Sequence, residues 1–122
     1  MLNRIAVILM ILFVSFSCNA QGKGVKLIKN TELKEVLQKN NNIQLIDVRT
    51  ENEFNSGTIK GAKNINYFSK DFKQEISKLD KNKAIYIFCQ VGGRSAKAAK
   101  IVSELGFKEV YDLKDGYSEW NK

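Results

Sequence analysis

The stretch IYIFCQVGGRSAKAAKIV, residues 85–102, joins three features: an apolar run, a cysteine followed by two glycines and an arginine, and an alanine-rich segment. The apolar run predicts a buried β-strand, and the alanine-rich segment predicts a helix. Cys89 therefore stands where a strand passes into the start of a helix. Ligands of open α/β sheets bind beyond the carboxyl ends of the strands, so this junction is the candidate site of the chain.

The rest of the chain alternates short apolar runs with segments of helical periodicity. Strands are expected at residues 25–28, 43–48, 62–65, 84–88 and 109–111, and helices after Asn30 or Thr31 and across 68–79 and 95–105, with helical turns at 49–57 and 116–120. The expected helix faces are Phe68, Phe72, Ile76 and Leu79 in one case and Ala96, Ala99, Val102 and Leu105 in the other, with Gly106 ending the second helix. This alternation predicts an α/β fold, a three-layer sandwich with a mostly parallel five-stranded sheet and helices on both faces.

Residues 1–20 have the pattern of an export signal. Arg4 precedes an apolar block of about twelve residues, shorter than the ~20 residues of a membrane-spanning helix. Cys18 follows a serine as in a lipoprotein processing site, but it also fits the small-residue site of an ordinary signal peptidase. We favour lipidation of Cys18, and we expect an exported, periplasmic protein that is attached to the membrane if lipidated. Residues 21–24 are expected to form a short tether, and a single domain to occupy 25–122.

Composition argues against several functional classes. The 20 basic residues outnumber the 13 acidic ones, but the lysines are scattered without interleaved aromatic residues, which favours a solvated surface over a nucleic-acid partner. The chain has no histidine, which excludes Ser-His and Cys-His nucleophile pairs and argues against a metal site. Beyond Cys18 the one cysteine is Cys89, so the domain has no internal disulfide if Cys18 is removed or lipidated.

The residues that follow Cys89 are suited to hold negative charge. Gly92 and Gly93 can adopt backbone angles that other residues avoid, so successive N–H groups can point to a common centre. A helix that begins near Arg94 and Ser95 adds unpaired N–H donors and the positive end of its dipole. A sulfur at that centre would be stabilised as a thiolate without a histidine base. The alternative is a buried structural cysteine before an ordinary glycine turn. The sequence Gly-Gly-Arg-Ser that follows, at the start of a helix, favours the reactive thiol.

Four segments of the chain form a recognisable set. They are Cys89-Gln90-Val91-Gly92-Gly93-Arg94-Ser95, IDVRTENEF (46–54), GTIKGAKNI (57–65) and LKDGYSEW (113–120). The first resembles the active-site loop C-x-x-G-x-R-S of single-domain rhodanese-like sulfurtransferases, and the other three match further segments of that family in the same order. The resemblance covers roughly residues 25–120 and implies the rhodanese-like form of the three-layer fold.

This resemblance implies a reaction and its participants. Cys89 would accept a sulfane sulfur from a small anionic donor such as thiosulfate and, as a persulfide, pass it to a thiol or cyanide-like acceptor. The anion-binding loop would consist of Gln90, Val91, Gly92, Gly93, Arg94 and Ser95. No cofactor is expected. The sequence does not determine the oligomeric state, for which we favour a monomer. Because Gln90 and Val91 make the loop neutral and partly apolar, the identity of the donor stays open.

Asp47 and Arg49 are expected to support the loop from the end of the neighbouring strand. We expect Asp47 either to pair with Arg94 or to cap the turn that follows its own strand, and the sequence does not separate the two roles. Arg49 is expected to organise the adjacent loops through Glu53.

Two other functions stay open at this stage. Phosphatases and arsenate reductases of related folds bind phosphate-sized oxyanions in loops with five residues between cysteine and arginine. Here four residues separate Cys89 from Arg94, and the tighter ring suits a sulfur atom better than a phosphoryl group. The other alternative is a sulfide carrier or protein-interaction module without turnover, against which the intact Cys89 loop argues.

Overall fold

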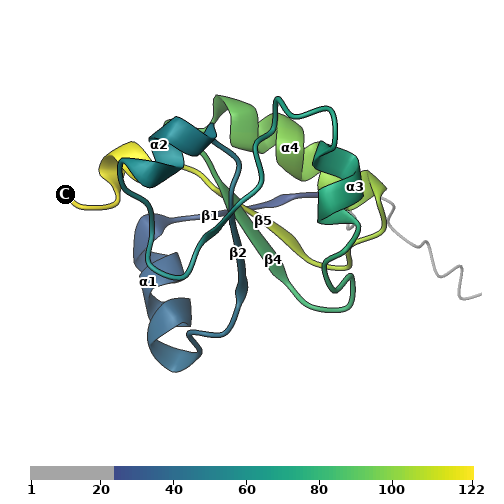
Figure 1. Cartoon of the computed structure of the whole chain (residues 1–122). Helices are drawn as coiled ribbons and strands as arrows, with labels where there is room; N and C mark the ends of the chain where they lie inside the picture. Colours follow the sequence, from purple (N-terminus) through teal and green to yellow (C-terminus); the bar gives the residue numbers. More distant parts are fainter. Residues whose placement is uncertain (1–23) are drawn as a thin grey trace, which may run out of the picture.

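The computed structural model describes residues 24–122. The elements, in chain order, are β1 (Lys26–Ile28), α1 (Asn30–Lys39), β2 (Gln44–Asp47), α2 (Glu51–Asn55), β3 (Lys63–Asn64), α3 (Phe72–Ile76), β4 (Ile85–Phe88), α4 (Gly93–Glu104), β5 (Val110–Leu113) and a final 3-10 turn (Tyr117–Glu119) (Figure 1). The expected leader at 1–20, with Cys18, lies outside the described residues, as does most of the tether at 21–24. Within residues 24–122, no helix is long and apolar enough to cross a membrane.

The five strands form one sheet in the order β1-β5-β4-β2-β3, and all neighbouring strands are parallel. Helix α1 covers one face, and α3 and α4 cover the other (Figure 1). The expected α/β sandwich is thereby confirmed. Because the strands are parallel, the residues that follow β2 and β4 come together at the same edge of the sheet.

Two apolar clusters fill the space between the sheet and its helices. The first joins β4 to α3 and α4 and includes Ile87, Ile76 and Val102. The second lies beneath α1 and includes Leu33 and Phe88. Successive residues of a strand point to opposite faces, which explains why Ile87 and Phe88 belong to different clusters. The central strand is therefore buried on both faces, and this is why its sequence is a continuous apolar run.

The helix expected across 68–79 is much shorter than its sequence pattern predicts. Only α3 is helical in this region, and Phe68, expected on the buried face, is 67% exposed. The Asn66 side chain accepts a hydrogen bond from the N–H of Phe68, and the Ser69 hydroxyl accepts one from the N–H of Asp71. Bonds from short polar side chains to the nearby backbone compete with helix formation, so the apolar spacing extends beyond the helix.

The buried face of α4 also differs from the expected one. Ser95, Ala98, Ala99 and Val102 are buried, whereas Ala96, expected on this face, is exposed. The buried residues recur at spacings of three and four, as one helix face requires, but they start at Ser95. Gly106 follows the helix with a φ of +98°, in the left-handed region expected of a glycine that ends a helix.

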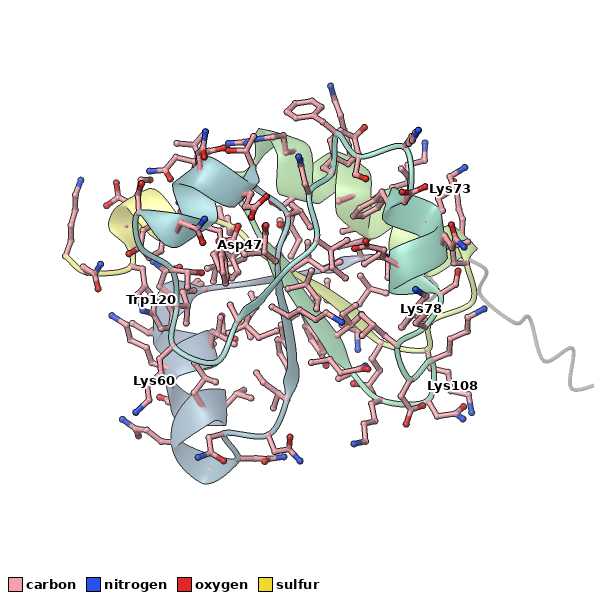
Figure 2. All side chains as sticks on the ribbon, viewed as in Figure 1. Asp47, Lys60, Lys73, Lys78, Lys108 and Trp120 are labelled. Atoms are coloured by element: carbon pink, nitrogen blue, oxygen red, sulfur yellow. The ribbon has the colours of Figure 1, made fainter. Side chains whose placement is uncertain are left out.

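Lysine side chains are distributed over the surface. Lys60 lies on one side of the molecule and Lys73, Lys78 and Lys108 on another, whereas Asp47 lies in the interior (Figure 2). Together these positions make no single basic stripe of the kind that follows a nucleic-acid backbone.

Replacing Ile87 with alanine should destabilise the domain strongly. The residue is 1% exposed in the centre of the sheet, and deletion of such a side chain costs about 2–5 kcal/mol because it leaves a cavity. Leu27, at 63% exposure on the edge strand β1, is the control, for which Leu27→Ala should change the free energy of unfolding by less than about 0.5 kcal/mol. Urea denaturation of the two variants measures the difference. Equal losses would contradict the assignment of the core.

Candidate active site

Cys89 follows the last residue of β4 and is 1% exposed. Its Sγ accepts hydrogen bonds from the main-chain N–H groups of Gly92, at 3.0 Å, and of Ser95, at 3.3 Å. Both donors belong to the segment that leads into α4, which we call the Cys89 loop (residues 89–95). Hydrogen-bond donors fixed around a sulfur atom favour negative charge on it. The main-chain amides of the loop therefore converge on the thiol.

The shape of the loop depends on glycine at position 92. Gly92 has a φ of +115°, which other residues avoid, and it directly precedes α4. A Cβ at this position would lie 3.1 Å from the carbonyl oxygen of Lys114. The Ser95 hydroxyl donates to the Gly92 carbonyl at 3.2 Å, so Gly92 is held through its C=O as well as its N–H. Helix α4, with twelve residues, adds the positive end of its dipole at the loop.

The C-terminal segment holds the Cys89 loop from outside. The N–H of Tyr117 donates to the Cys89 carbonyl at 2.9 Å, and the N–H of Ser118 donates to the Gln90 carbonyl at 3.0 Å. Gly116 has a φ of +71°, and a Cβ there would press on the Gln90 carbonyl group, 2.7 Å from its carbon. In the sequence, Gly116 starts an expected helical turn and lies in the segment 113–120 that shares the family resemblance. Its contact with the loop depends on a distant part of the chain, and no local signal reports it.

Gly116→Ala should therefore displace the loop. We expect the rate of Cys89 alkylation to fall roughly tenfold or more, because the displaced N–H groups no longer favour the thiolate, which is the reactive form of the thiol. Gly61→Ala is the matched control, since Gly61 has a φ of +91° but no atom within 4 Å of the added Cβ. Both variants carry backbone strain of about 1–3 kcal/mol. If the two substitutions slow alkylation equally, Gly116 acts through stability alone and the positional role is wrong.

Asp47 pairs with Arg49 and not with Arg94, so that part of the expectation is wrong. The Arg49 Nη2 lies 2.7 Å from Asp47 Oδ2, with both side chains buried. The N–H of Arg49 also donates to Asp47 Oδ1 at 3.0 Å, which is the alternative role of capping the turn after the strand. Asp47 and Arg49 are only two residues apart at the end of β2, so this ion pair is local in the sequence. From there Arg49 Nη1 donates to the Gln90 side chain at 3.0 Å and ties the pair to the Cys89 loop.

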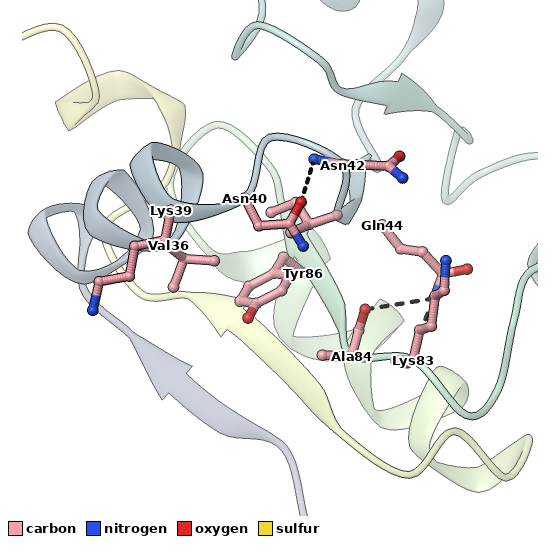
Figure 3. Close-up of a pocket in the computed structure, with 9 residues that line it drawn as sticks. Val36, Lys39, Asn40, Asn42, Gln44, Lys83, Ala84 and Tyr86 are labelled. Atoms are coloured by element: carbon pink, nitrogen blue, oxygen red, sulfur yellow. Dashed lines mark hydrogen bonds between the residues drawn. The ribbon is translucent and has the colours of Figure 1, made fainter.

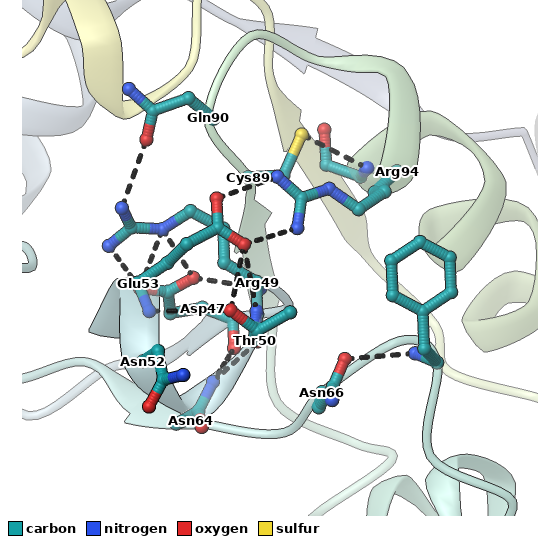
Figure 4. Close-up of polar contacts among 12 residues, drawn as sticks. Asp47, Arg49, Thr50, Asn52, Glu53, Asn64, Asn66, Cys89, Gln90 and Arg94 are labelled. Carbon is teal, nitrogen blue, oxygen red and sulfur yellow. Dashed lines mark hydrogen bonds and ion pairs between the residues drawn. The ribbon is translucent and has the colours of Figure 1, made fainter. Parts of the chain in front are cut away.

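Glu53 pairs with Arg94 and not with Arg49, a second correction. Arg94 donates from Nη1 and Nη2 to the two carboxylate oxygens of Glu53, at 2.6 and 2.9 Å (Figure 4). The hydrogen bond from Arg94 lowers the pKa of Glu53 to about 2, and the same bond raises the pKa of Arg94. The Thr50 N–H and hydroxyl donate to Glu53 as well, so α2 begins in a capping box that presents this carboxylate. Arg94 is therefore directed towards α2 and not into the loop.

Asp112 is a buried carboxyl that the sequence did not single out. It lies on β5, is 3% exposed, and its Oδ1 has no hydrogen-bond partner. Burial raises its pKa, and a hydrogen bond with the Ser95 side chain partly opposes that rise. Ser95 thus interacts with both groups, with Cys89 Sγ through its N–H and with Asp112 through its side chain. In the sequence, Asp112 falls just beyond the strand expected at 109–111, so its burial within β5 was not predicted.

Asp112→Asn should change how stability depends on pH. The folded state raises the pKa of Asp112 above its ordinary value of 3.8. The contribution of this carboxyl to the free energy of unfolding is therefore fully present below pH 3.8 and is lost as the pH rises through the raised pKa. The free energy of unfolding of the wild-type protein should therefore fall relative to the variant as the pH rises above about 3.8. Urea denaturation over a series of pH values measures this difference. Glu53 is present in both proteins, so its titration cancels when their free energies of unfolding are compared. If that difference in free energy does not change with pH, the raised pKa of Asp112 is wrong.

Of the hollows in the described residues, two lie at opposite ends of the parallel strands. One, of about 450 Å³, is at the amino ends of β2 and β4, and its lining includes Val36, Gln44 and Tyr86 (Figure 3). The other, of about 410 Å³, lies beside the Cys89 loop and is lined in part by Gln90 and Tyr117. The nucleophile and the converging amides lie at the second end, and this end is the candidate active site.

The family of this chain follows from its comparison with known proteins. The model of the rhodanese-like domain family matches residues 29–122, and the chain belongs to this family.

Individual relatives show the same likeness. The thiosulfate sulfurtransferase GlpE of Shewanella oneidensis is 34% identical over 97 residues, covering 80% of this chain and 87% of that protein. The uncharacterized protein YqhL of Bacillus subtilis is 32% identical over 120 residues, covering 98% and 94% of the two chains. The crystal structure of a rhodanese-like domain protein from Staphylococcus aureus superposes with a TM-score of 0.71 at 31% identity, covering 79% of this chain and 91% of that one.

Proposed function

We propose that the protein is a sulfurtransferase that moves a sulfane sulfur from a donor such as thiosulfate to a thiophilic acceptor through a persulfide on Cys89. The observation that carries the proposal is the pair of N–H groups, from Gly92 and Ser95, on the sulfur. These donors favour negative charge on the thiolate and, after loading, on the persulfide. Membership of the rhodanese-like family supports the reaction class, and similarity to a protein named thiosulfate sulfurtransferase supports the kind of donor.

The proposed cycle has two half-reactions. In the first, the Cys89 thiolate attacks the outer sulfur of thiosulfate, the S–S bond of the donor breaks, and sulfite leaves with the bonding electron pair. In the second, a thiolate or cyanide attacks the outer sulfur of the persulfide, and the Cys89 thiolate leaves. Electrons balance in each step without an oxidant, and neither step needs a histidine to move a proton.

The geometry of Arg94 argues against the oxyanion-hydrolase alternative. A phosphoryl group in a cysteine loop needs guanidinium donors directed at its oxygens. Here two donors of Arg94 are held by Glu53, outside the ring of main-chain amides. The sulfide-carrier alternative shares the loading step with the proposed enzyme and differs from it in turnover.

We also propose that residues 1–20 direct export and that Cys18 is lipidated, which would place the domain in the periplasm on a membrane anchor. The support is the apolar block behind Arg4 and the Ser17-Cys18 pair.

Cys89→Ser should abolish sulfur transfer without unfolding the domain, because the hydroxyl is a far weaker nucleophile at neutral pH. Mass spectrometry after exposure to thiosulfate should show a gain of one sulfur on Cys89 in the wild-type protein and none in the variant. Turnover of thiosulfate with cyanide should exceed hydrolysis of an aryl phosphate by the same sample.

Each outcome of this experiment separates one alternative. Loading without turnover would indicate a carrier, and transfer that survives Cys89→Ser would refute the catalytic assignment. The mass of the mature N-terminus reports whether Cys18 is lipidated or removed.

A further inference from the structure

Both arginine side chains beside Cys89 already have carboxylate partners. Arg49 is buried against Asp47, and four of its side-chain hydrogen bonds go to that carboxylate or to the Gly57 carbonyl. Arg94 forms a two-point ion pair with Glu53. Each pair is neutral as a unit, so the cationic charge of the site is used to join loops and contributes little to binding an external anion.

The remaining side chains of the Cys89 loop carry no charge. Gln90 accepts a hydrogen bond from Arg49, and Val91 is apolar. Lys114, which touches the loop, meets Gly92 with its main-chain carbonyl oxygen. A doubly charged inorganic donor would thus find main-chain N–H groups and the helix dipole but, among the side chains of the loop, no unpaired cation.

The rim of the loop exposes large apolar side chains. Within the described residues, the exposed large hydrophobic residues are Leu27, Phe68 and Val91, at 63%, 67% and 70%. Val91 belongs to the loop, and the Phe68 ring lies 5.9 Å from the guanidinium carbon of Arg94. Two of these three exposed side chains are therefore part of the Cys89 loop or beside its Arg94, where an apolar group of a substrate could contact them.

We propose that the preferred sulfur donor is a small organic sulfane compound, a thiosulfonate or persulfide, whose apolar group packs on Phe68 and Val91. This inference rests on the proposed function and names its donor class. With an aryl thiosulfonate, the Cys89 thiolate attacks the outer sulfur, the bond from that sulfur to the sulfonyl sulfur breaks, and the aryl sulfinate leaves with the electron pair. The products are the Cys89 persulfide and the sulfinate, with no other reactant.

Three donors separate charge from apolar contact. Thiosulfate is a dianion, methanethiosulfonate is a small monoanion, and benzenethiosulfonate has the same reactive group with a phenyl ring. The second-order rate constant for loading Cys89, followed by mass spectrometry, is the measured quantity. We expect the wild-type protein to prefer benzenethiosulfonate to methanethiosulfonate by about tenfold more than free cysteine does, from partial burial of the ring.

Phe68→Ala should remove this preference, slowing benzenethiosulfonate about tenfold and the other two donors less than about twofold. Leu27→Ala is the matched control because it removes an equally exposed apolar side chain from β1, and all three rates should stay unchanged. Val91→Lys should raise the rate with thiosulfate several-fold at low salt and less at high salt, because it introduces an unpaired cation at the rim.

The outcomes distinguish this inference from the proposed function. If no donor loads wild-type Cys89, the proposed function fails. If donors load but Phe68→Ala slows all three equally, Phe68 acts only by supporting Arg94, and the donor class is wrong. An unchanged preference in Phe68→Ala, or an equal loss in Leu27→Ala, would likewise overturn the inference.

Discussion

The candidate active site depends on two hydrogen bonds to one sulfur atom. The N–H groups of Gly92 and Ser95 reach Cys89 only because the chain turns through a left-handed glycine between the central strand and α4. Main-chain donors have fixed positions and do not titrate, so they favour an anionic sulfur in a chain that has no imidazole. The surrounding features are arranged to keep this turn in place.

Two ion pairs and one glycine hold the turn from three sides. Asp47 and Arg49 connect the end of β2 to Gln90, and Glu53 connects α2 to Arg94. From the third side Gly116 allows the C-terminal segment to approach the loop and donate two N–H groups to its carbonyls. Both arginines are neutralised by carboxylates, so the loop presents mainly backbone dipoles to an incoming substrate. An apolar rim lies beside these dipoles.

Sequence patterns failed where local polar groups or distant partners competed with them. The spacing of Phe68 with Phe72 predicted a longer helix, but the Asn66 side chain takes the N–H of Phe68 and the backbone turns instead. For Asp47, the sequence offered Arg94 and a local turn equally, and the local partner was taken because Arg49 is only two residues away. Asp112 gave no signal, since its burial depends on where α4 packs over β5.

The sequence by itself determined the alternation of strands and helices, the position of Cys89 at the end of the most apolar strand, and the glycines of its loop. These features are local, because periodicity and backbone freedom act over a few residues. Tertiary structure alone decided that Glu53 neutralises Arg94, and it alone leaves no room for a side chain at residue 116. Arg94 and Glu53 are 41 residues apart, and only the parallel sheet brings their loops to one edge.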